Sequence, residues 1–165
     1  MIETERKLII LKPDEAILRR EKSFTKSEIV QIYLNSDNST HRVRRRKYES
    51  GKLELTENKK IRISKMSSIE DERIITEREF EALAVNIENG AHPLSKTRLT
   101  FEYFGRVIEI DIYPEWQKTA ILEVELESEE EEMKLPEYIN VLKEVTGSKD
   151  YSNHSMAHKF PSEII

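Results

Sequence analysis

Apolar and polar residues alternate along much of the chain, which is typical of strands with one apolar and one polar face. In residues 107–113 isoleucines alternate with acidic residues, and residues 120–126 repeat this pattern. By the same criterion, strands are expected over residues 1–10, 29–34, 41–47, 52–63, 69–75, 94–104, 107–113 and 120–126. Short turns between most of these runs predict hairpins. The pattern therefore indicates seven or eight strands, nearly all with charged side chains on one face.

Helices are expected at three points along the chain. Asp14 caps a short helix, and Thr76 begins a longer one, because Glu79 follows Thr76 at the spacing of a capping box. Pro136 opens a third, amphipathic helix that ends at residues 146–147. Loops, turns and breaks are expected at residues 23–27, 35–39, 49–51, 67–68 and 105.

Charges on the polar strand faces are sorted by sign. Three arginines share one face of residues 41–47, a lysine and an arginine share one face of residues 94–104, and carboxylate pairs occupy others. An antiparallel sheet with one face in water explains polar faces but does not predict this sorting. If the strands closed into an eight-stranded barrel, the charges would line an interior with room only for side chains and a small ligand.

Length and composition narrow the class of protein. The 165 residues lack a glycine- or proline-rich linker and predict a single domain over residues 1–165. There are 27 basic and 32 acidic residues, so the net charge of −5 hides blocks of both signs. The absence of cysteine excludes disulfides and thiolate metal sites. With no signal-peptide pattern and no apolar run of membrane-spanning length, a soluble, cytoplasmic protein without membrane partners is expected.

Glu3, Glu5 and Lys7 share one face of the first expected strand. Two carboxylates ~7 Å apart on that face repel each other, and one lysine cannot neutralise both. The stretch therefore favours a metal ion or a basic neighbour, with a solvated edge strand as the plain alternative.

These three residues open a series of motifs whose order resembles that of the CYTH, or triphosphate tunnel metalloenzyme, superfamily. That superfamily comprises class IV adenylyl cyclases, thiamine triphosphatases and inorganic triphosphatases. Further matching positions are Gln31, Tyr33 and Leu34, then Arg42 and Arg44, Glu70 and Glu72, Lys96 and Arg98, Asp111, Glu123 and Glu125, and finally residues 151–157. The resemblance covers nearly the whole chain.

One position departs from the family pattern. The family has Thr-x-Lys on its fourth strand, whereas here Thr56 is followed two residues later by Asn58. Either Lys60, which is in phase, or Lys59, moved inward by a bulge, would supply the missing positive charge.

The resemblance implies an α+β fold, a closed eight-stranded antiparallel β-barrel with a few flanking helices. Its tunnel would bind a triphosphate and one or two Mg²⁺ or Mn²⁺ ions. Metal ligation is expected from Glu3, Glu5, Glu70, Glu72, Asp111, Glu123 and Glu125. Phosphate binding is expected from Lys7, Arg42, Arg44, Lys60, Lys96 and Arg98. Glu3, Glu5 and Lys7 are the expected catalytic residues.

The residue types support these roles independently. Guanidinium groups meet phosphate oxygens through two parallel hydrogen bonds, which suits arginine better than lysine. Carboxylate oxygens are the ligands that Mg²⁺ and Mn²⁺ prefer. Two unit charges ~4 Å apart interact by about 4 kcal/mol at an effective dielectric constant of ~20. Neither the acidic nor the basic residues can therefore stay fully ionised without the other set or a ligand.

Three functions fit this ionic lining. The first is metal-dependent hydrolysis of inorganic triphosphate or of an organic triphosphate such as ATP or thiamine triphosphate. The second is a class IV adenylyl cyclase that converts ATP to cyclic AMP and pyrophosphate, and the third is a non-catalytic polyphosphate-binding module. The substrate, the metal and the oligomeric state, including a homodimer, stay open.

Other residues that suggest sites are weaker. His41, His92, His154 and His158 show no metal-ligand spacing and are expected at the surface or in turns. The basic run 44–47 could meet nucleic-acid phosphates, but the chain is acidic overall and carries no nucleic-acid motif, so no nucleic-acid partner is expected.

Overall fold

The computed structural model describes residues 1–37 and 39–165. Its elements, in chain order, are β1 (Ile2–Leu11), α1 (Glu15–Leu18), β2 (Lys22–Leu34), β3 (Thr40–Tyr48), β4 (Leu53–Arg62), β5 (Ser67–Ile74), α2 (Glu77–Ala84), β6 (Leu94–Tyr103), β7 (Arg106–Ile112), β8 (Thr119–Glu125), β9 (Val141–Glu144), the 3₁₀ helix η1 (Lys149–Tyr151) and α3 (Asn153–His158). All eight expected strands are present. The expected turn at 35–39 includes Asn38, which lies outside the described residues.

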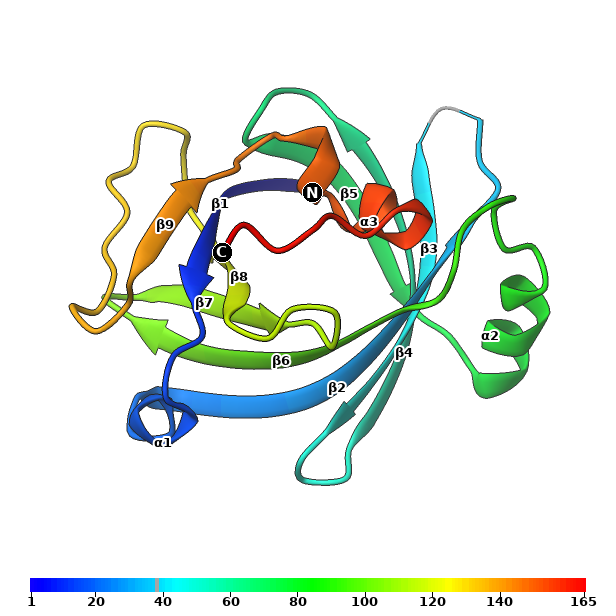
Figure 1. The fold of residues 1–165 in the computed structure, drawn as a ribbon. Coiled ribbons are helices and arrows are strands. Elements are labelled where there is room, and N and C mark those ends of the chain that lie inside the picture. Colours follow the sequence, from blue (N-terminus) through cyan, green and yellow to red (C-terminus); the bar gives the residue numbers. More distant parts are fainter. Residues whose placement is uncertain (38) are drawn as a thin grey trace.

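Strands β1 to β8 close into an antiparallel barrel (Figure 1). The strand order is β5-β4-β3-β2-β6-β7-β8-β1, and β1 then pairs with β5 to complete the ring. Strand β1 closes the ring because its first residues pair with β5 and its later residues pair with β8, as in Ile2 with Ile69 and Glu5 with Glu125. The expected closed eight-stranded barrel is confirmed, with β9 as an additional strand.

The prediction of a helix beginning at Pro136 is wrong. The chain makes a turn, in which the Ile139 amide donates to the Pro136 carbonyl over 3.1 Å, and then forms β9. Strand β9 pairs with Leu8, Ile9 and Ile10 of β1 on the edge that β5 leaves open. Unpaired backbone groups at a strand edge are costly when buried, so pairing with β1 overrides the helical pattern of the segment.

Two expected breaks are also part of strands. Residues 23–27, expected as a loop, belong to β2, which pairs with β6 from Lys22 onward through a register shift near Ser23, where φ is 58°. Ser67 and Ser68 are the first residues of β5 and pair with β1. In both places the strand continues because closing the barrel supplies partners for its backbone groups.

The two expected helix starts are confirmed. The Asp14 side chain accepts a hydrogen bond from the α1 backbone, and Thr76 and Glu79 form a reciprocal capping box at the start of α2. Helix α2 packs on the barrel where its Phe80 contacts a cluster that contains Val43. Among the described residues, no helix is long and apolar enough to cross a membrane.

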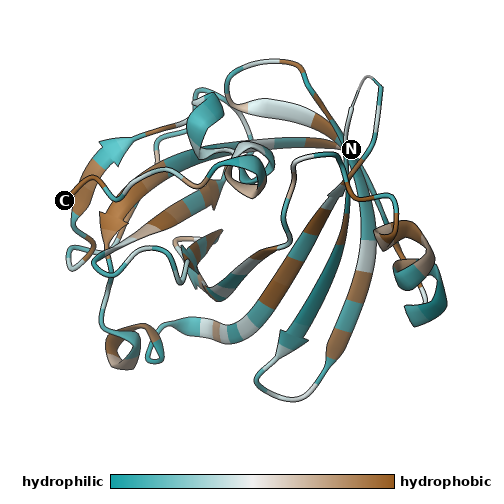
Figure 2. Ribbon diagram, turned by 45° about the vertical axis from the view of Figure 1, so that its right-hand side comes forward, coloured by the Kyte–Doolittle hydropathy of each residue, from teal (hydrophilic) through white to brown (hydrophobic). Residues whose placement is uncertain are grey.

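Apolar side chains form most of their contacts outside the lumen. Figure 2 shows hydrophilic and hydrophobic residues alternating along the strands. The largest cluster contains Leu99, Ile108 and Leu122, which alternate along their strands with charged lumen residues and therefore lie on the outer face. A second cluster around Tyr113 and Trp116 includes residues of α3. Apolar packing therefore stabilises the barrel mainly outside the lumen, and the lumen is free to hold charged side chains.

Candidate functional site

A cavity of about 850 Å³ lies inside the barrel and is lined mainly by charged side chains. Strand alternation directs the charged faces of seven strands into it. Of the residues that the sequence singled out, the cavity brings together Glu3, Glu5, Lys7, Arg42, Arg44, Lys60, Glu70, Glu72, Arg98, Glu123 and Glu125. Lys96 and Asp111 are buried beside it.

The charges are sorted around the ring of strands into two walls. The acidic wall is formed by neighbouring strands β7, β8, β1 and β5, which carry Glu109, Asp111, Glu123, Glu125, Glu3, Glu5, Glu70 and Glu72. The basic wall is formed by β4, β3 and β6, which carry Lys60, Arg42, Arg44, Arg46, Lys96 and Arg98, while β2, between β3 and β6, brings no described charged residue to the cavity. Opposite charges therefore meet closely at two boundaries, between β6 and β7 and between β4 and β5.

At the β6–β7 boundary the charges are paired and buried. The Arg98 guanidinium donates to both oxygens of Asp111, over 2.7 and 2.8 Å, and to Glu109 over 2.8 Å. Lys96 lies 2.8 Å from Asp111, and neither side chain is more than 2% exposed. Burial and the nearby Arg98 lower the pKa of Lys96 to about 8, although Asp111 opposes this. Burial opposes ionisation of Asp111 too, but Arg98 and Lys96 hold its pKa below the usual range.

At the β4–β5 boundary the departure from the family pattern is resolved. Lys60 faces the cavity and its ammonium lies 3.0 Å from Glu3. Asn58 also faces the cavity and donates to Glu70 and Glu72. Lys59 is exposed, and β4 pairs without a bulge, so Lys60 is the lysine that this strand brings to the lumen.

Between the boundaries, the acidic wall holds carboxylates in different states. Glu123 is buried, which opposes its ionisation, yet Lys7 at 3.3 Å together with Arg98 and Lys96 outweighs that burial and lowers its pKa to about 2. Glu5 forms no ion pair with any described residue, and burial together with Glu123 raises its pKa well above the usual range. Glu125 remains accessible from the cavity, and partial burial and repulsion from Glu109 raise its pKa to about 7.

Between the boundaries, two arginines of the basic wall, Arg42 and Arg44, are at most loosely paired. Arg44 is buried, with its guanidinium 3.8 Å from Glu72, and burial together with Arg42 lowers its pKa to about 10. The Nε of Arg42 is buried and has no hydrogen-bond partner among the described residues, and the same holds for Thr56 Oγ1 and Gln31 Oε1. Buried polar atoms are nearly always paired in folded proteins, so these three atoms are not satisfied by the described side chains alone.

The C-terminal segment, whose residues 151–157 match the last position of the family series, completes the lumen. It crosses the barrel in Figure 1 and lines the cavity with residues around Asn153. The Lys7 ammonium donates to the Tyr151 carbonyl over 3.2 Å. The Asn153 side-chain oxygen accepts from Lys96 over 3.3 Å and from the Tyr113 hydroxyl over 2.6 Å. These contacts attach the C-terminal segment to strands that are far from it in the sequence.

Three further lumen groups, Arg46, Glu109 and Asn153, were given no role from the sequence. Arg46 and Glu109 line the cavity, and strand alternation had already placed them on the faces of Arg44 and Asp111. Asn153 belongs to the matching segment 151–157, but its place in the lumen depends on how the C-terminal segment folds back.

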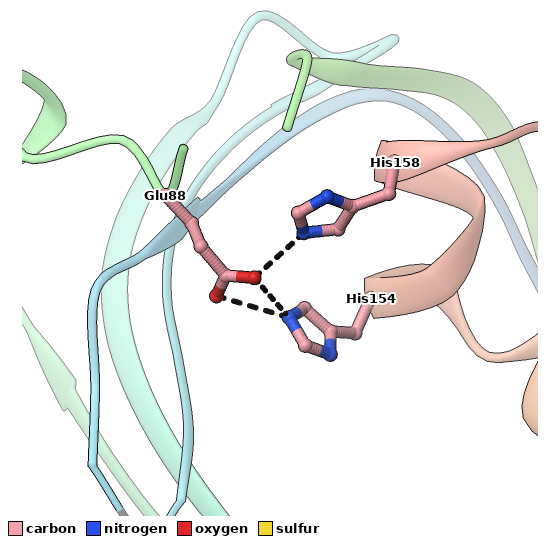
Figure 3. Close-up of side chains that lie close together, drawn as sticks. All are labelled: Glu88, His154 and His158. Atoms are coloured by element: carbon pink, nitrogen blue, oxygen red, sulfur yellow. Dashed lines mark hydrogen bonds and ion pairs between the residues drawn. The ribbon is translucent and has the colours of Figure 1, made fainter. Parts of the chain in front are cut away.

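His154 and His158, which were expected at the surface or in turns, belong to a helix and lie close to a carboxylate. His154 and His158 lie one turn apart on α3, and both face the Glu88 carboxylate (Figure 3). The sequence signal was their separation by four residues, which places side chains on one helix face. His41 pairs with Glu57 alone, over 2.6 Å.

Comparisons with known proteins support the barrel assignment. No protein-family model and no curated protein sequence matches the chain. The crystal structure of the inorganic triphosphatase NE1496 is similar with a TM-score of 0.58 at 25% identity, over 96% of this chain and 99% of that chain.

Two further solved structures share the fold at lower identity. The PH1819 protein of Pyrococcus horikoshii OT3 is similar with a TM-score of 0.57 at 24% identity, over 76% of this chain and 80% of that one. HpAC1 from Hippeastrum, an adenylyl cyclase-type protein described as having a dominant triphosphatase activity, gives a TM-score of 0.50 at 16% identity, over 76% and 80%. The shared barrel and the ordered charged motifs along its strands place the chain in the CYTH, or triphosphate tunnel metalloenzyme, superfamily.

Proposed function

We propose that the chain is a metal-dependent phosphohydrolase that cleaves inorganic triphosphate, or a related organic triphosphate, inside the barrel. The observation that carries the proposal is the division of the lumen into an acidic wall and a basic wall. A triphosphate with about four negative charges needs the basic wall, and a divalent cation bound with it needs the acidic one. Similarity to the triphosphatase NE1496 over nearly the full length of both chains supports the same chemistry.

The basic wall would hold the phosphates. Arg42 and Arg44 are the leading candidates, since Arg42 forms no ion pair with a described residue and Arg44 is only loosely paired. A guanidinium pair of this kind can meet phosphate oxygens at several points without first breaking a strong ion pair. Arg98, Lys96 and Lys60 would add charge from the two boundaries, where Asp111 and Glu3 already fix their positions.

The acidic wall fits a divalent cation. Glu5 and Glu125 face the same cavity from paired strands, and neither is neutralised by an ion pair with a described residue. Their oxygens are hard ligands of the kind that Mg²⁺ and Mn²⁺ take. When bound, the metal would reduce the charge of the phosphates and acidify an attacking water. Further ligands in this proposal are Glu3, Glu123, Glu70, Glu72 and Asp111, although Asp111 already binds Arg98 and Lys96.

Lys7 would stabilise charge during the reaction. It is a positively charged residue within the acidic wall. Its ammonium lies 3.3 Å from Glu123 and donates to the Tyr151 carbonyl over 3.2 Å. A fixed ammonium at the border between metal ligands and phosphates can stabilise negative charge that develops on the leaving group. Glu3 and Glu5 precede it on the same strand face and would orient the attacking water.

Inorganic triphosphate is the first choice of substrate because the cavity offers little to a nucleoside. The described lining residues are charged, small and polar, or glycine, apart from Met1, Tyr33, Val145 and His154. Adenine and ribose need apolar surface and directed polar contacts. A triphosphate alone needs the ionic groups that dominate the lining.

The test is a phosphate-release screen of inorganic triphosphate, ATP and thiamine triphosphate with Mg²⁺ and with Mn²⁺, with cyclic AMP assayed in parallel. We expect a kcat/KM for inorganic triphosphate at least about tenfold above that for ATP, a preference of ~1.4 kcal/mol in transition-state binding. A Glu5→Gln variant purified in the same way measures contaminating phosphatase. Formation of cyclic AMP faster than phosphate release would favour a cyclase, and tight binding without turnover would favour a polyphosphate-binding module.

A further inference from the structure

Glu88, His154 and His158 form a convergent cluster at one end of the barrel. The Nε2 atom of His154 lies 3.1 Å from both Glu88 oxygens, and the Nε2 atom of His158 lies 2.6 Å from one of them. The three potential ligand atoms all lie within 4.8 Å of one another. Figure 3 shows both rings pointing from α3 toward the carboxylate, which comes from the segment after α2.

The backbone on both sides of the cluster is held independently of it. The Glu88 amide donates to the Tyr33 carbonyl of β2 over 2.8 Å. Helix α3 is capped by Ser152 and accepts at Ala157 a 2.8 Å hydrogen bond from the His92 amide. The three side chains therefore converge from two pre-positioned segments. This reduces the loss of conformational entropy on ligand binding.

Two imidazole nitrogens and one carboxylate are a donor set for a late first-row transition metal. Zn²⁺ takes such His₂Glu sets with a fourth position left for water, whereas Mg²⁺ favours oxygen ligands alone. We propose that Glu88, His154 and His158 bind a Zn²⁺-type ion at a site separate from the acidic wall of the lumen. Such an ion joins α3 to the connection between α2 and β6.

The location gives the site a consequence for the lumen. His154 lines the cavity, and its neighbour Asn153 contacts Lys96 and Tyr113. An ion at the cluster holds α3 in the position in which it makes these contacts. The bound ion therefore stabilises the segment that completes the lumen, whatever the substrate is.

The test uses Co²⁺ as a spectroscopic probe on untagged full-length protein that has been stripped with EDTA. Excess Mg²⁺ is present throughout, because it competes for carboxylate sites but not for imidazole nitrogens. We expect one equivalent of Co²⁺ to give the visible absorption of a tetrahedral nitrogen-ligated ion, and Zn²⁺ to displace it. We also expect Zn²⁺ at about 100 times its Kd to raise the thermal midpoint by about 5 °C or more.

Matched variants assign the signal. His158→Ala and, separately, His154→Gln are each expected to lower Co²⁺ affinity at least about tenfold and to remove the thermal shift. His41→Ala removes the other histidine paired with a glutamate, and Glu5→Gln removes a lumen carboxylate, and both should keep the signal. An unchanged Co²⁺ spectrum in both cluster variants, or the absence of a nitrogen-ligated spectrum in the wild-type protein, would overturn the proposal.

Discussion

Glu5 and Glu125 are partners in the β1–β8 ladder, and both line the cavity without an ion pair to any described residue. Burial and repulsion from neighbouring carboxylates raise the pKa of both, that of Glu125 to about 7. Asp111 differs, because both of its oxygens bind the buried cations Arg98 and Lys96. One wall therefore contains carboxylates that stabilise the fold and carboxylates that remain available to a ligand.

We expect Glu5→Gln or Glu125→Gln to reduce metal-dependent phosphate release by about 100-fold or more, since a metal site is worth several kcal/mol in the transition state. Each change removes a charge from a crowded acidic wall, so the thermal midpoint without metal should hold or rise. Phosphate release and thermal unfolding measure the two effects.

Glu28→Gln is the matched control for these two variants. Glu28 is exposed on β2 and accepts a hydrogen bond from Thr97, outside the cavity. It should change neither quantity appreciably. Unfolding of either lumen variant at room temperature would show that the carboxylates are structural, and full activity of both would remove them from the metal site.

Arg44→Ala should weaken substrate binding far more than Arg45→Ala. Arg44 is buried at the cavity, whereas Arg45 is 43% exposed and pairs with Glu77 of α2 over 3.3 Å. Losing a charge-assisted contact costs about 1.5–3 kcal/mol, whereas losing an exposed ion pair costs about 0–1 kcal/mol. Titration of a non-hydrolysable triphosphate analogue compares the two, and equal losses would contradict a role for the inward face of β3.

Asp111→Ala should destabilise the fold by about 3–5 kcal/mol, because Lys96 would remain buried without its carboxylate and Arg98 would keep only Glu109. Glu109→Ala should cost less, since Glu109 is more exposed and Arg98 retains Asp111. Urea unfolding of both variants gives the difference. If Asp111→Ala were as stable as the wild type but inactive, Asp111 would be a ligand in function rather than a structural partner.

Metal-free protein should lose stability as the pH rises from about 4.5 to about 7, because folding raises the pKa of Glu125 from 4.5 to about 7. The folded state then holds a proton that the unfolded chain has already released, so the contribution is present below pH 4.5 and is lost as pH rises through the folded pKa. Glu125→Gln lacks this contribution, so its thermal midpoint should depend less on pH across that interval. Mg²⁺ affinity should increase over the same range, because the ion competes with the proton.

Much of the barrel lining could be predicted from the chain alone. Strand alternation separates Arg44 from Arg45 before any tertiary contact is known, because successive side chains point to opposite faces. The capping box at Thr76 and Glu79 is likewise local, since all of its partners lie within four residues. The ordered charged motifs were therefore sufficient to identify the superfamily and to predict which residues face the lumen.

Tertiary structure decided what depends on distant partners. Residues 141–144 form β9 rather than part of a helix because the free edge of β1 pairs with them. The Glu88 cluster forms because α3 folds back over a loop more than sixty residues away in sequence. Above all, Glu5 and Asp111 look alike in the sequence, because each is a carboxylate on the polar face of a strand in which polar and apolar residues alternate. Their difference arises because β7 lies next to the basic strand β6, whereas β1 lies between acidic strands β8 and β5.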